Sequence, residues 1–309
     1  MNPAVSVKKL TKIFNGFTAV DSVSFETQKG EIYGFLGANG AGKTTVIRIL
    51  CGLLEPSSGR AIVAGYDAAK EPEKVKQRLG YMPQKSALYG ALTVAENMEF
   101  YSGLYGMEEN RIKQRIHEVS VQTELQNMLN NPVSALPGGI RQRVSLACAI
   151  MHEPEIVFLD EPTAGVDPML RRRFWEIIDG LSEKGTTVFV TTHYMDEVEH
   201  CHRAALMNNG RIIKEGPITE IKKSTFKKPV FEVETENITK AYNVLGKYRE
   251  KIGEISMHGA KLHIIPSAGP AAAVRIIRSI LKKHGVSAGK ITGAEPTMED
   301  VFVKVVREG

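Results

Sequence analysis

Residues 37–45 fit the pattern G-x-x-x-x-G-K-[ST], which is typical of a loop that wraps around phosphate groups. An apolar run of the strand type, residues 31–36, precedes this loop, and an apolar run of the helix type, residues 46–50, follows it. Glycines let the backbone approach phosphate oxygens closely, and the helix turns its positive dipole end toward the same anion. The pattern therefore predicts a site for a nucleoside triphosphate.

Individual side chains of this loop have distinct expected roles. Lys43 reaches the β- and γ-phosphates as a positive charge, and Thr44 places its hydroxyl on Mg²⁺. The alternative is a glycine-rich turn in front of an ordinary helix. We expect the whole loop to bind the phosphates of the nucleotide: Gly37, Ala38, Asn39, Gly40, Ala41, Gly42, Lys43, Thr44 and Thr45.

Two acidic residues follow an apolar run later in the chain. Residues 156–159 have the composition of a buried parallel strand, and Asp160 and Glu161 come directly after them. Ligands of open α/β sheets bind beyond the carboxyl ends of the strands, so both acids are expected near the phosphates. Asp160 suits holding Mg²⁺ through water, and Glu161 suits orienting or deprotonating the attacking water. The alternative is that the two acids only cap a following helix.

A histidine and an aromatic residue complete the candidate site. His193 follows the predicted strand of residues 187–191, and beside a phosphate loop and an acidic pair it predicts a γ-phosphate contact. Phe14 stands near Gly16, upstream of the loop, where an aromatic ring could stack on adenine. We favour Phe14 over Phe17 for this role, and a core position stays open for each ring.

The composition is that of an ordinary globular protein, with 309 residues, 42% hydrophobic and 24% charged. No apolar run approaches the ~18 residues that span a bilayer, and the first residues lack a signal-peptide pattern. We therefore expect a soluble chain that meets a membrane only through a partner. Cys51, Cys148 and Cys201 lack metal-ligand spacing, which favours free thiols in a reducing cytoplasm.

The net charge of +5 comes entirely from residues 225–309, which hold 14 Lys and Arg against 9 Asp and Glu. A basic surface of this kind can bind anionic lipid or nucleic acid. Because the sequence has no run of five or six basic residues, a solvated surface is the favoured interpretation. No nucleic-acid partner is expected.

We expect the candidate site to lie in an α/β domain of residues 1–224, with a helical subdomain at about residues 90–152. Thr93 and Glu96 form a capping box at the start of this subdomain. Asn209-Gly210 predicts a hairpin turn shortly before the domain ends. Alternating patterns predict strands at residues 5–11, 23–27, 60–63 and 79–82, and helical periodicity covers residues 94–105 and 110–129.

Residues 225–309 are expected to form a separate small α+β domain after a linker at Lys227-Lys228-Pro229. Strand, helix, hairpin, helix and strand patterns follow one another, which is the order of a ferredoxin-like β-α-β-β-α-β unit. Thr297 caps a last helix that has Asp300 at its third position. Regulation, dimer contact and docking stay open as the role of this domain.

Six separated stretches together resemble the ATP-binding subunits of ABC transporters, in that family's order and spacing over residues 5 to about 224. The resemblance implies an α/β P-loop NTPase fold of the ABC ATPase type, with a mixed sheet core and a helical subdomain. The tail, above all residues 295–302, is similar to the C-terminal extension of many bacterial type-2 exporter ATPases, which include drug exporters. The matched stretches are similar to Walker A (residues 37–45), the Q-loop (Gln84), Walker B with its catalytic glutamate (156–161), the D-loop (164–167), the H-loop (His193) and the adenine-stacking aromatic (Phe14).

The resemblance also implies how such a chain works. Two subunits, either copies or homologues, close over two MgATP, and hydrolysis with Glu161 as general base reopens the pair. Integral membrane permease subunits docked near Gln84 follow this movement, at the cytoplasmic face of the inner membrane. The implied contacts of the γ-phosphate are Lys43, Gln84 and His193 of one subunit and Gly138 and Gly139 of the other. Asp167 is implied as a nucleotide-binding residue, and Gln84 as a Mg²⁺ ligand beside Thr44 and Asp160.

One stretch departs from the family pattern. The signature normally reads Leu-Ser-Gly-Gly-Gln, whereas residues 136–140 read Leu-Pro-Gly-Gly-Ile. Pro137 has neither the hydroxyl nor the N–H, although Gly138 and Gly139 still stand at a helix start, a second potential anion site. We expect either a slower ATPase or a partner subunit with an intact signature. The alternative is that Pro137 only preorganises the helix start.

A soluble ABC-type ATPase that acts on nucleic acid or ribosomes is the rival interpretation. Such proteins carry a long coiled coil before the signature, or two nucleotide modules. Here about 95 residues without sustained heptads separate Lys43 from Gly138, and one phosphate loop is present. The pattern therefore favours transport.

Overall fold

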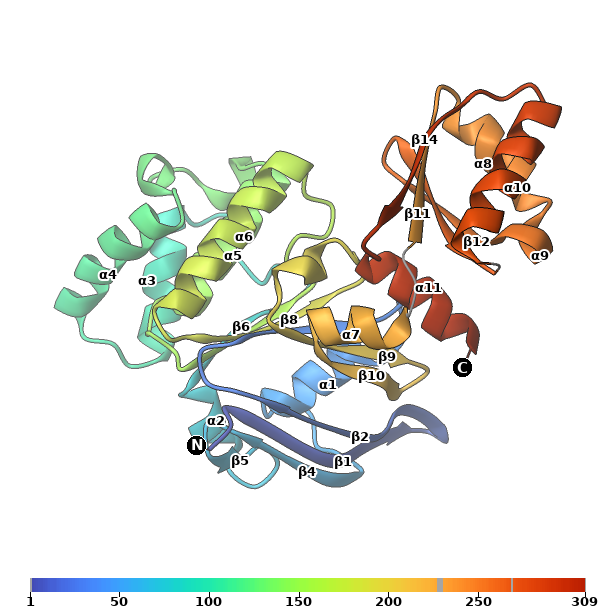
Figure 1. Cartoon of the computed structure of the whole chain (residues 1–309). Helices are drawn as coiled ribbons and strands as arrows, with labels where there is room; N and C mark the ends of the chain where they lie inside the picture. Colours follow the sequence, from blue (N-terminus) through green and yellow to red (C-terminus); the bar gives the residue numbers. More distant parts are fainter. Residues whose placement is uncertain (1, 227–229, 268, 309) are drawn as a thin grey trace. The chain divides into compact units, whose positions relative to one another are not determined.

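The computed structural model describes residues 2–226, 230–267 and 269–308. The chain divides into two compact units, Met1–Ile218 and Thr219–Gly309 (Figure 1). The division lies at the start of helix α7 (Ile218–Thr225), whereas the sequence pattern placed it after Ser224. The expected linker, Lys227-Lys228-Pro229, lies outside the described residues.

The larger sheet of the first unit is mixed, as the sequence predicts, with the strand order β10-β9-β3-β8-β7-β6. Strands β9 and β10 pair antiparallel, and the other neighbours run parallel. Asn209 and Gly210, with φ of 46° and 79°, form the expected hairpin turn between β9 and β10. The strands are β3 (Ile32–Leu36), β6 (Leu79–Met82), β7 (Ile156–Asp160), β8 (Thr187–Thr192), β9 (Arg203–Asn208) and β10 (Arg211–Pro217).

A smaller antiparallel sheet has the order β2-β1-β4-β5. Helix α1 (Lys43–Leu50) lies between the two sheets (Figure 1). Its apolar residues Val46, Ile47 and Leu50 are buried in one core with side chains from both sheets, which holds the start of α1 beside the end of β3. The strands are β1 (Val5–Phe14), β2 (Phe17–Thr27), β4 (Ser58–Val63) and β5 (Tyr66–Asp67).

The expected helical subdomain is formed by α3 (Val94–Leu104), α4 (Glu109–Gln122) and α5 (Gly138–Ile150). The capping box of Thr93 and Glu96 is confirmed, because each side chain accepts a backbone N–H of the other residue. The other helices of this unit are α2 (Pro72–Lys76), α6 (Pro168–Glu183) and the 3₁₀ segments Gln126–Met128, Val133–Ala135 and Glu197–His200.

The helix predicted from residue 110 to about 129 begins as expected, but its predicted end is wrong, because α4 ends at Gln122. Glu124 has a φ of 54°, in the left-handed region, and the Leu125 N–H then donates to the Ser120 carbonyl at 2.7 Å. A left-handed residue with such a backward bond is the usual end of a helix, although glycine normally takes that place. The helix therefore stops at a residue whose type gives no stop signal.

The second unit is an antiparallel sheet with the order β12-β13-β11-β14. Its buried core includes Phe231, Val233 and Leu262 from the sheet and Ile277 and Leu281 from a helix. The elements follow one another in the predicted order of strand, helix, hairpin, helix and strand, with a last helix after them. The elements are β11 (Val230–Thr235), α8 (Ile238–Gly246), α9 (Arg249–Ile252), β12 (Gly253–His258), β13 (Lys261–Pro266), α10 (Pro270–Lys283), β14 (Ala288–Ala294) and α11 (Met298–Glu308).

The start of α11 confirms the predicted cap. Thr297 donates from N and Oγ1 to Oδ2 of Asp300, at 2.9 and 3.0 Å, and the Asp300 N–H donates back to Thr297 Oγ1 at 3.3 Å. Asp300 is buried and also lies 3.0 Å from Nδ1 of His263 on β13. The motif in the tail thus ties the last helix to the sheet.

Candidate functional site

The loop of residues 37–45 connects the end of β3 to the first turn of α1, as the sequence predicts. Gly42 has a φ of 106°, and a Cβ there would lie 2.4 Å from the Ala19 carbonyl. A Cβ on Gly37 would lie equally close to the Met207 carbonyl. These two positions need glycine, and they leave the loop backbone free to curve around an anion.

Lys43 lies at the centre of this loop, with only 4% of its surface exposed. Its Nζ donates to the carbonyl oxygens of Gly37 and Ala38, at 2.8 and 3.2 Å. The same ammonium lies 3.3 Å from Oε1 of Glu161. A fixed positive charge therefore stands between the loop backbone and the acidic pair.

Asp160, at the end of β7, is held by hydroxyl groups on one oxygen. Oδ1 accepts from Thr191 Oγ1 at 2.6 Å and from Thr44 Oγ1 at 3.2 Å. Oδ2 is buried, and it has no hydrogen-bond partner among the residues that the structure describes. Burial raises the pKa of Asp160, while the Thr191 and Thr44 hydroxyls oppose that rise. A free carboxylate oxygen at this position fits a cation with oxygen ligands.

The donor set agrees with Mg²⁺ held mainly by phosphates. Within the described residues, no group of three or more His, Cys, Asp or Glu side chains could enclose a metal ion. Mg²⁺ in nucleotide sites needs one or two protein ligands besides water and phosphate oxygens. Thr44 and Asp160 are in contact and can supply them. Gln84 donates instead to Glu161, so the structure places it against the second acid of the pair.

Glu161 lies where three separate segments meet. Its Oε2 accepts from Nε2 of Gln84 at 3.0 Å and lies 3.1 Å from Nδ1 of His193, while Oε1 faces Lys43. Gln84 follows β6, His193 follows β8, and Lys43 begins α1. A carboxylate with this set of donors can orient a water molecule and accept its proton.

The backbone of Glu161 is held in an uncommon conformation. Its φ is 50°, in the left-handed region, where a residue with a Cβ is strained. Its N–H donates to both the carbonyl and the hydroxyl of Thr191, at 3.1 and 3.0 Å. Thr191 therefore contacts both acids: its hydroxyl binds the Asp160 carboxylate, and its hydroxyl and carbonyl both accept the Glu161 N–H.

Phe14 ends β1 and is 42% exposed, and Phe17 is 67% exposed. The core position that the sequence left open for these rings is therefore wrong. Lys12 Nζ lies 5.1 Å from the Phe14 ring centroid. The Phe14 ring remains accessible for stacking on a planar group.

Gly138 and Gly139 begin α5, and Asp167 lies directly before α6. Gly138 is exposed, and Pro137 caps α5 without any side-chain hydrogen bond. Oδ1 of Asp167 accepts the N–H groups of Met169 and Leu170, so Asp167 caps α6. Among the residues that the structure describes, no hydrogen bond or ion pair joins Gly138, Gly139 or Asp167 to Lys43.

Sequence reasoning missed Thr191 and Glu197. Thr191 lies beside Asp160 in the parallel register of β7 and β8, which a pattern within one strand cannot reveal. Glu197, in a short 3₁₀ segment, is buried and accepts hydroxyl groups from Thr163 and Thr192. Acidic residues are mostly exposed, and no motif around Glu197 marks this one as buried.

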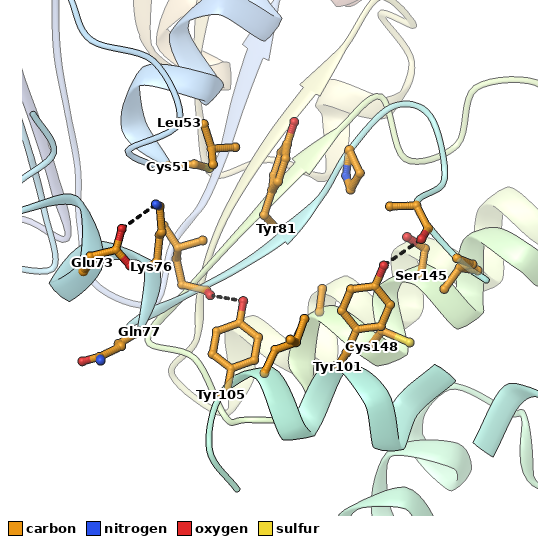
Figure 2. A pocket seen from close by; sticks show the side chains of 16 residues that line it. Cys51, Leu53, Glu73, Lys76, Gln77, Tyr81, Tyr101, Tyr105, Ser145 and Cys148 are labelled. Carbon is orange, nitrogen blue, oxygen red and sulfur yellow. Dashed lines mark hydrogen bonds and ion pairs between the residues drawn. The ribbon is translucent and has the colours of Figure 1, made fainter. Parts of the chain in front are cut away.

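A pocket of about 550 Å³ lies between the helical subdomain and the sheet (Figure 2). Tyr81 of β6 and Tyr101 of α3 line it, together with Cys51 and Cys148, which are free thiols as expected. Its lining is mostly apolar and aromatic.

No helix in the described part of the chain is long and apolar enough to cross a membrane.

Comparisons with known proteins agree with this geometry. A family model described as ABC transporter matches residues 20–164, and an AAA-domain model named for an AbiEii toxin of type IV toxin–antitoxin systems matches residues 140–197. The chain is 48% identical over 218 residues to the "Probable multidrug ABC transporter ATP-binding protein YbhF" of Escherichia coli K12. That match covers 71% of this chain and 38% of the relative, so the chain spans well under half of that protein.

Two further comparisons extend the match. The chain is 32% identical over 305 residues, 97% of each protein, to the linearmycin resistance ATP-binding protein LnrL of Bacillus subtilis strain 168. A solved dimeric, post-hydrolysis ATP-binding cassette bound to ADP and Pi is similar with a TM-score of 0.64 and 26% identity. The similarity covers 69% of this chain and 98% of that one. The phosphate loop, the acidic strand end and these relatives together show that the chain belongs to the ATP-binding proteins of the ABC transporter family.

Proposed function

We propose that this chain hydrolyses ATP as the ATP-binding subunit of an ABC exporter. The observation that carries this proposal is the position of Glu161, whose carboxylate lies within 3.3 Å of Lys43 Nζ and 3.1 Å of His193 Nδ1. Lys43 marks the place of the β- and γ-phosphates, so Glu161 faces the side from which water attacks. A general base in this place contributes about 10²–10⁴-fold to the rate.

The other residues of the site have roles that follow from their contacts. The loop backbone binds the phosphates, Lys43 neutralises their charge, and His193 holds the γ-phosphate from the end of β8. Phe14 stacks on the adenine ring. Bound Mg²⁺ offsets negative charge on the phosphates. Thr44 and Asp160 would hold this ion, and Gln84 keeps Glu161 oriented.

We further propose that a second ATP-binding subunit completes each site. Gly138 is exposed at the start of a helix of 13 residues, where backbone N–H groups can bind the γ-phosphate of another copy. A similar solved cassette is dimeric. Because Pro137 replaces the family's serine, this contact lacks one donor, and we expect either slow turnover or a partner with an intact signature.

The membrane partner is proposed to bind at the pocket of Figure 2. Leu53 and Leu104 line the pocket and are 48% and 67% exposed, so apolar surface is open at its edge. Pro83, also in the lining, directly precedes Gln84. A permease helix with an apolar side chain in this pocket would contact the segment that carries Gln84 to Glu161. The chain would then lie at the cytoplasmic face of the membrane, held by its partner.

The test of ATP hydrolysis is Glu161→Gln. We expect the turnover rate to fall by roughly 10²–10⁴-fold, because the amide cannot accept a proton from water. Affinity for ATP should be retained. Glu155→Gln is the matched control, since this exposed acid lies just before the same strand and pairs with Arg78. Normal hydrolysis by Glu161→Gln would contradict the proposal.

The test of transport is the identity of the partner. We expect an integral membrane protein to purify with the chain, and a charged substitution at Leu104 to reduce that association. Recovery with ribosomes or DNA would instead support the rival function.

A further inference from the structure

Glu197 is a buried acid outside the site described above. It opens the 3₁₀ segment Glu197–His200 and is 2% exposed. Its Oε1 accepts from Oγ1 of Thr163, and its Oε2 accepts from Oγ1 of Thr192 at 2.7 Å. Each carboxylate oxygen is thus bound by a hydroxyl from a different segment of the chain.

The two threonines belong to the segments that carry the site residues. Thr163 lies two residues after Glu161, and Thr192 lies directly before His193. Because His193 Nδ1 also contacts Oε2 of Glu161 at 3.1 Å, the contacts close a ring. The ring runs from Glu161 through Thr163 and Glu197 to Thr192 and back through His193.

The ring also fixes the backbone on both sides of His193. Thr192 Oγ1 donates to Glu197 and accepts the N–H of Tyr194 at 2.9 Å. The guanidinium of Arg171 lies 4.3 Å from the Tyr194 ring, and its Nε lies 3.4 Å from Glu197 Oε1. The segment around His193 is therefore held from α6 as well as from Glu197.

A carboxylate in this position is costly unless it is bound on both oxygens. Burial raises the pKa of Glu197, and the hydroxyls of Thr163 and Thr192 and the charge of Arg171 oppose that rise. Loss of one of these hydrogen bonds would leave a buried polar group unpaired, which is energetically costly. A fully paired network therefore holds its side chains in one arrangement. A role in folding alone would not require that both hydroxyls flank site residues.

We propose that Glu197 is a positioning residue, which sets the separation of Glu161 and His193 by binding Thr163 and Thr192 at once. This inference rests on the proposed ATP hydrolysis. Errors of about 1 Å in the placement of catalytic groups cost on the order of 10²-fold in rate. We expect nucleotide binding by the loop of residues 37–45 to be retained when the ring is broken, because the loop backbone binds the phosphates.

The first test compares threonines of one strand. Thr192→Val should lower the turnover rate by about 10- to 100-fold and leave the affinity for ATP within about twofold. Thr187→Val is the matched control, because Thr187 is equally buried on β8 but its hydroxyl accepts the Gly30 N–H at the far end. Glu197→Gln, which keeps one acceptor, should retain more activity than Glu197→Leu. Equal activity of Thr192→Val and Thr187→Val would overturn the inference.

The second test begins with a measurement that does not depend on hydrolysis. The imidazole NMR signals of His193, assigned by their loss in His193→Ala, should shift in Glu197→Gln without added nucleotide and stay unchanged in Thr187→Val. In a double-mutant cycle, Glu197→Gln should have little further effect on turnover once His193 is alanine. The inference would be overturned if the His193 signals did not shift and the losses of turnover in Glu197→Gln and His193→Ala were additive. If the wild-type chain itself fails to hydrolyse ATP, the proposed function fails instead, and the NMR comparison still decides on the ring.

Discussion

The hydroxyl of Thr191 donates to Oδ1 of Asp160 at 2.6 Å, from the neighbouring position in the parallel register of β7 and β8. Thr44 donates to the same oxygen, and Oδ2 has no partner in the described part of the chain. Two hydroxyls on one oxygen leave the other oxygen of the carboxylate for a cation. Thr191 therefore prepares the proposed Mg²⁺ site without binding the ion itself.

Thr191→Val should weaken the effect of Mg²⁺ on nucleotide binding by roughly 10-fold, because a hydrogen bond to a charged group contributes about 1.5–3 kcal/mol. Titration of a fluorescent ATP analogue with and without Mg²⁺ measures this. Binding without Mg²⁺ should not change, Thr191→Ser should restore the wild-type value, and Thr187→Val should have no effect. An unaltered Mg²⁺ dependence in Thr191→Val would show that Asp160 needs no such orientation.

Pro137→Ser should raise the turnover rate by about 10-fold or more, since a serine hydroxyl supplies a donor at the start of α5. Steady-state ATPase assays of the full chain measure the gain. Pro132→Ser is a suitable control, because Pro132 also precedes a helical segment of the same subdomain and is exposed. No gain in turnover would mean that Pro137 only preorganises the loop in front of α5.

The stability of the chain should fall in acid through His152. This ring stacks on Tyr105 with 3.5 Å between centroids, and burial lowers its pKa to about 4. Between its ordinary pKa of about 6.5 and pH 4, the unfolded chain binds more protons here, so the free energy of unfolding decreases as pH drops through this window.

The measurement is the thermal midpoint at a series of pH values from 7 to 4. His152→Phe keeps an aromatic ring against Tyr105 and removes the titrating group, so its midpoint should fall less steeply over that window. His117→Gln, on the exposed face of α4, should follow the wild type. Identical slopes for all three proteins would contradict the assignment.

Glu124 lies two residues after the end of α4, in the left-handed region, and binds Arg143 and Arg173 at 2.8 and 2.9 Å. Glu124→Ala removes both ion pairs and keeps the backbone strain, so it should destabilise the fold. Glu124→Gly removes the same ion pairs but relieves the strain, and should be more stable than the alanine variant by roughly 1 kcal/mol. Urea denaturation measures the difference. At Glu99, exposed within α3, the same two substitutions should rank in the opposite order.

The sequence alone predicted those features that depend on neighbours in the chain. The loop of residues 37–45, the apolar strand before Asp160 and the turn at Asn209-Gly210 are all set by local sterics and composition. The resemblance to the ABC family came from the order of such motifs, and the mixed sheet was what this resemblance implied. The capping boxes at Thr93 and Thr297 were predictable for the same reason.

Only the tertiary structure decided which side chains surround Glu161 and where α4 ends. Gln84 and His193 reach Glu161 from 77 and 32 residues away, and Thr191 meets Asp160 through the pairing of two strands. The chain turns into the left-handed region at Glu124, where Arg143 and Arg173 on other helices bind its carboxylate. Contacts of this range depend on the packing of whole elements, and a residue's own neighbours in the chain do not encode them.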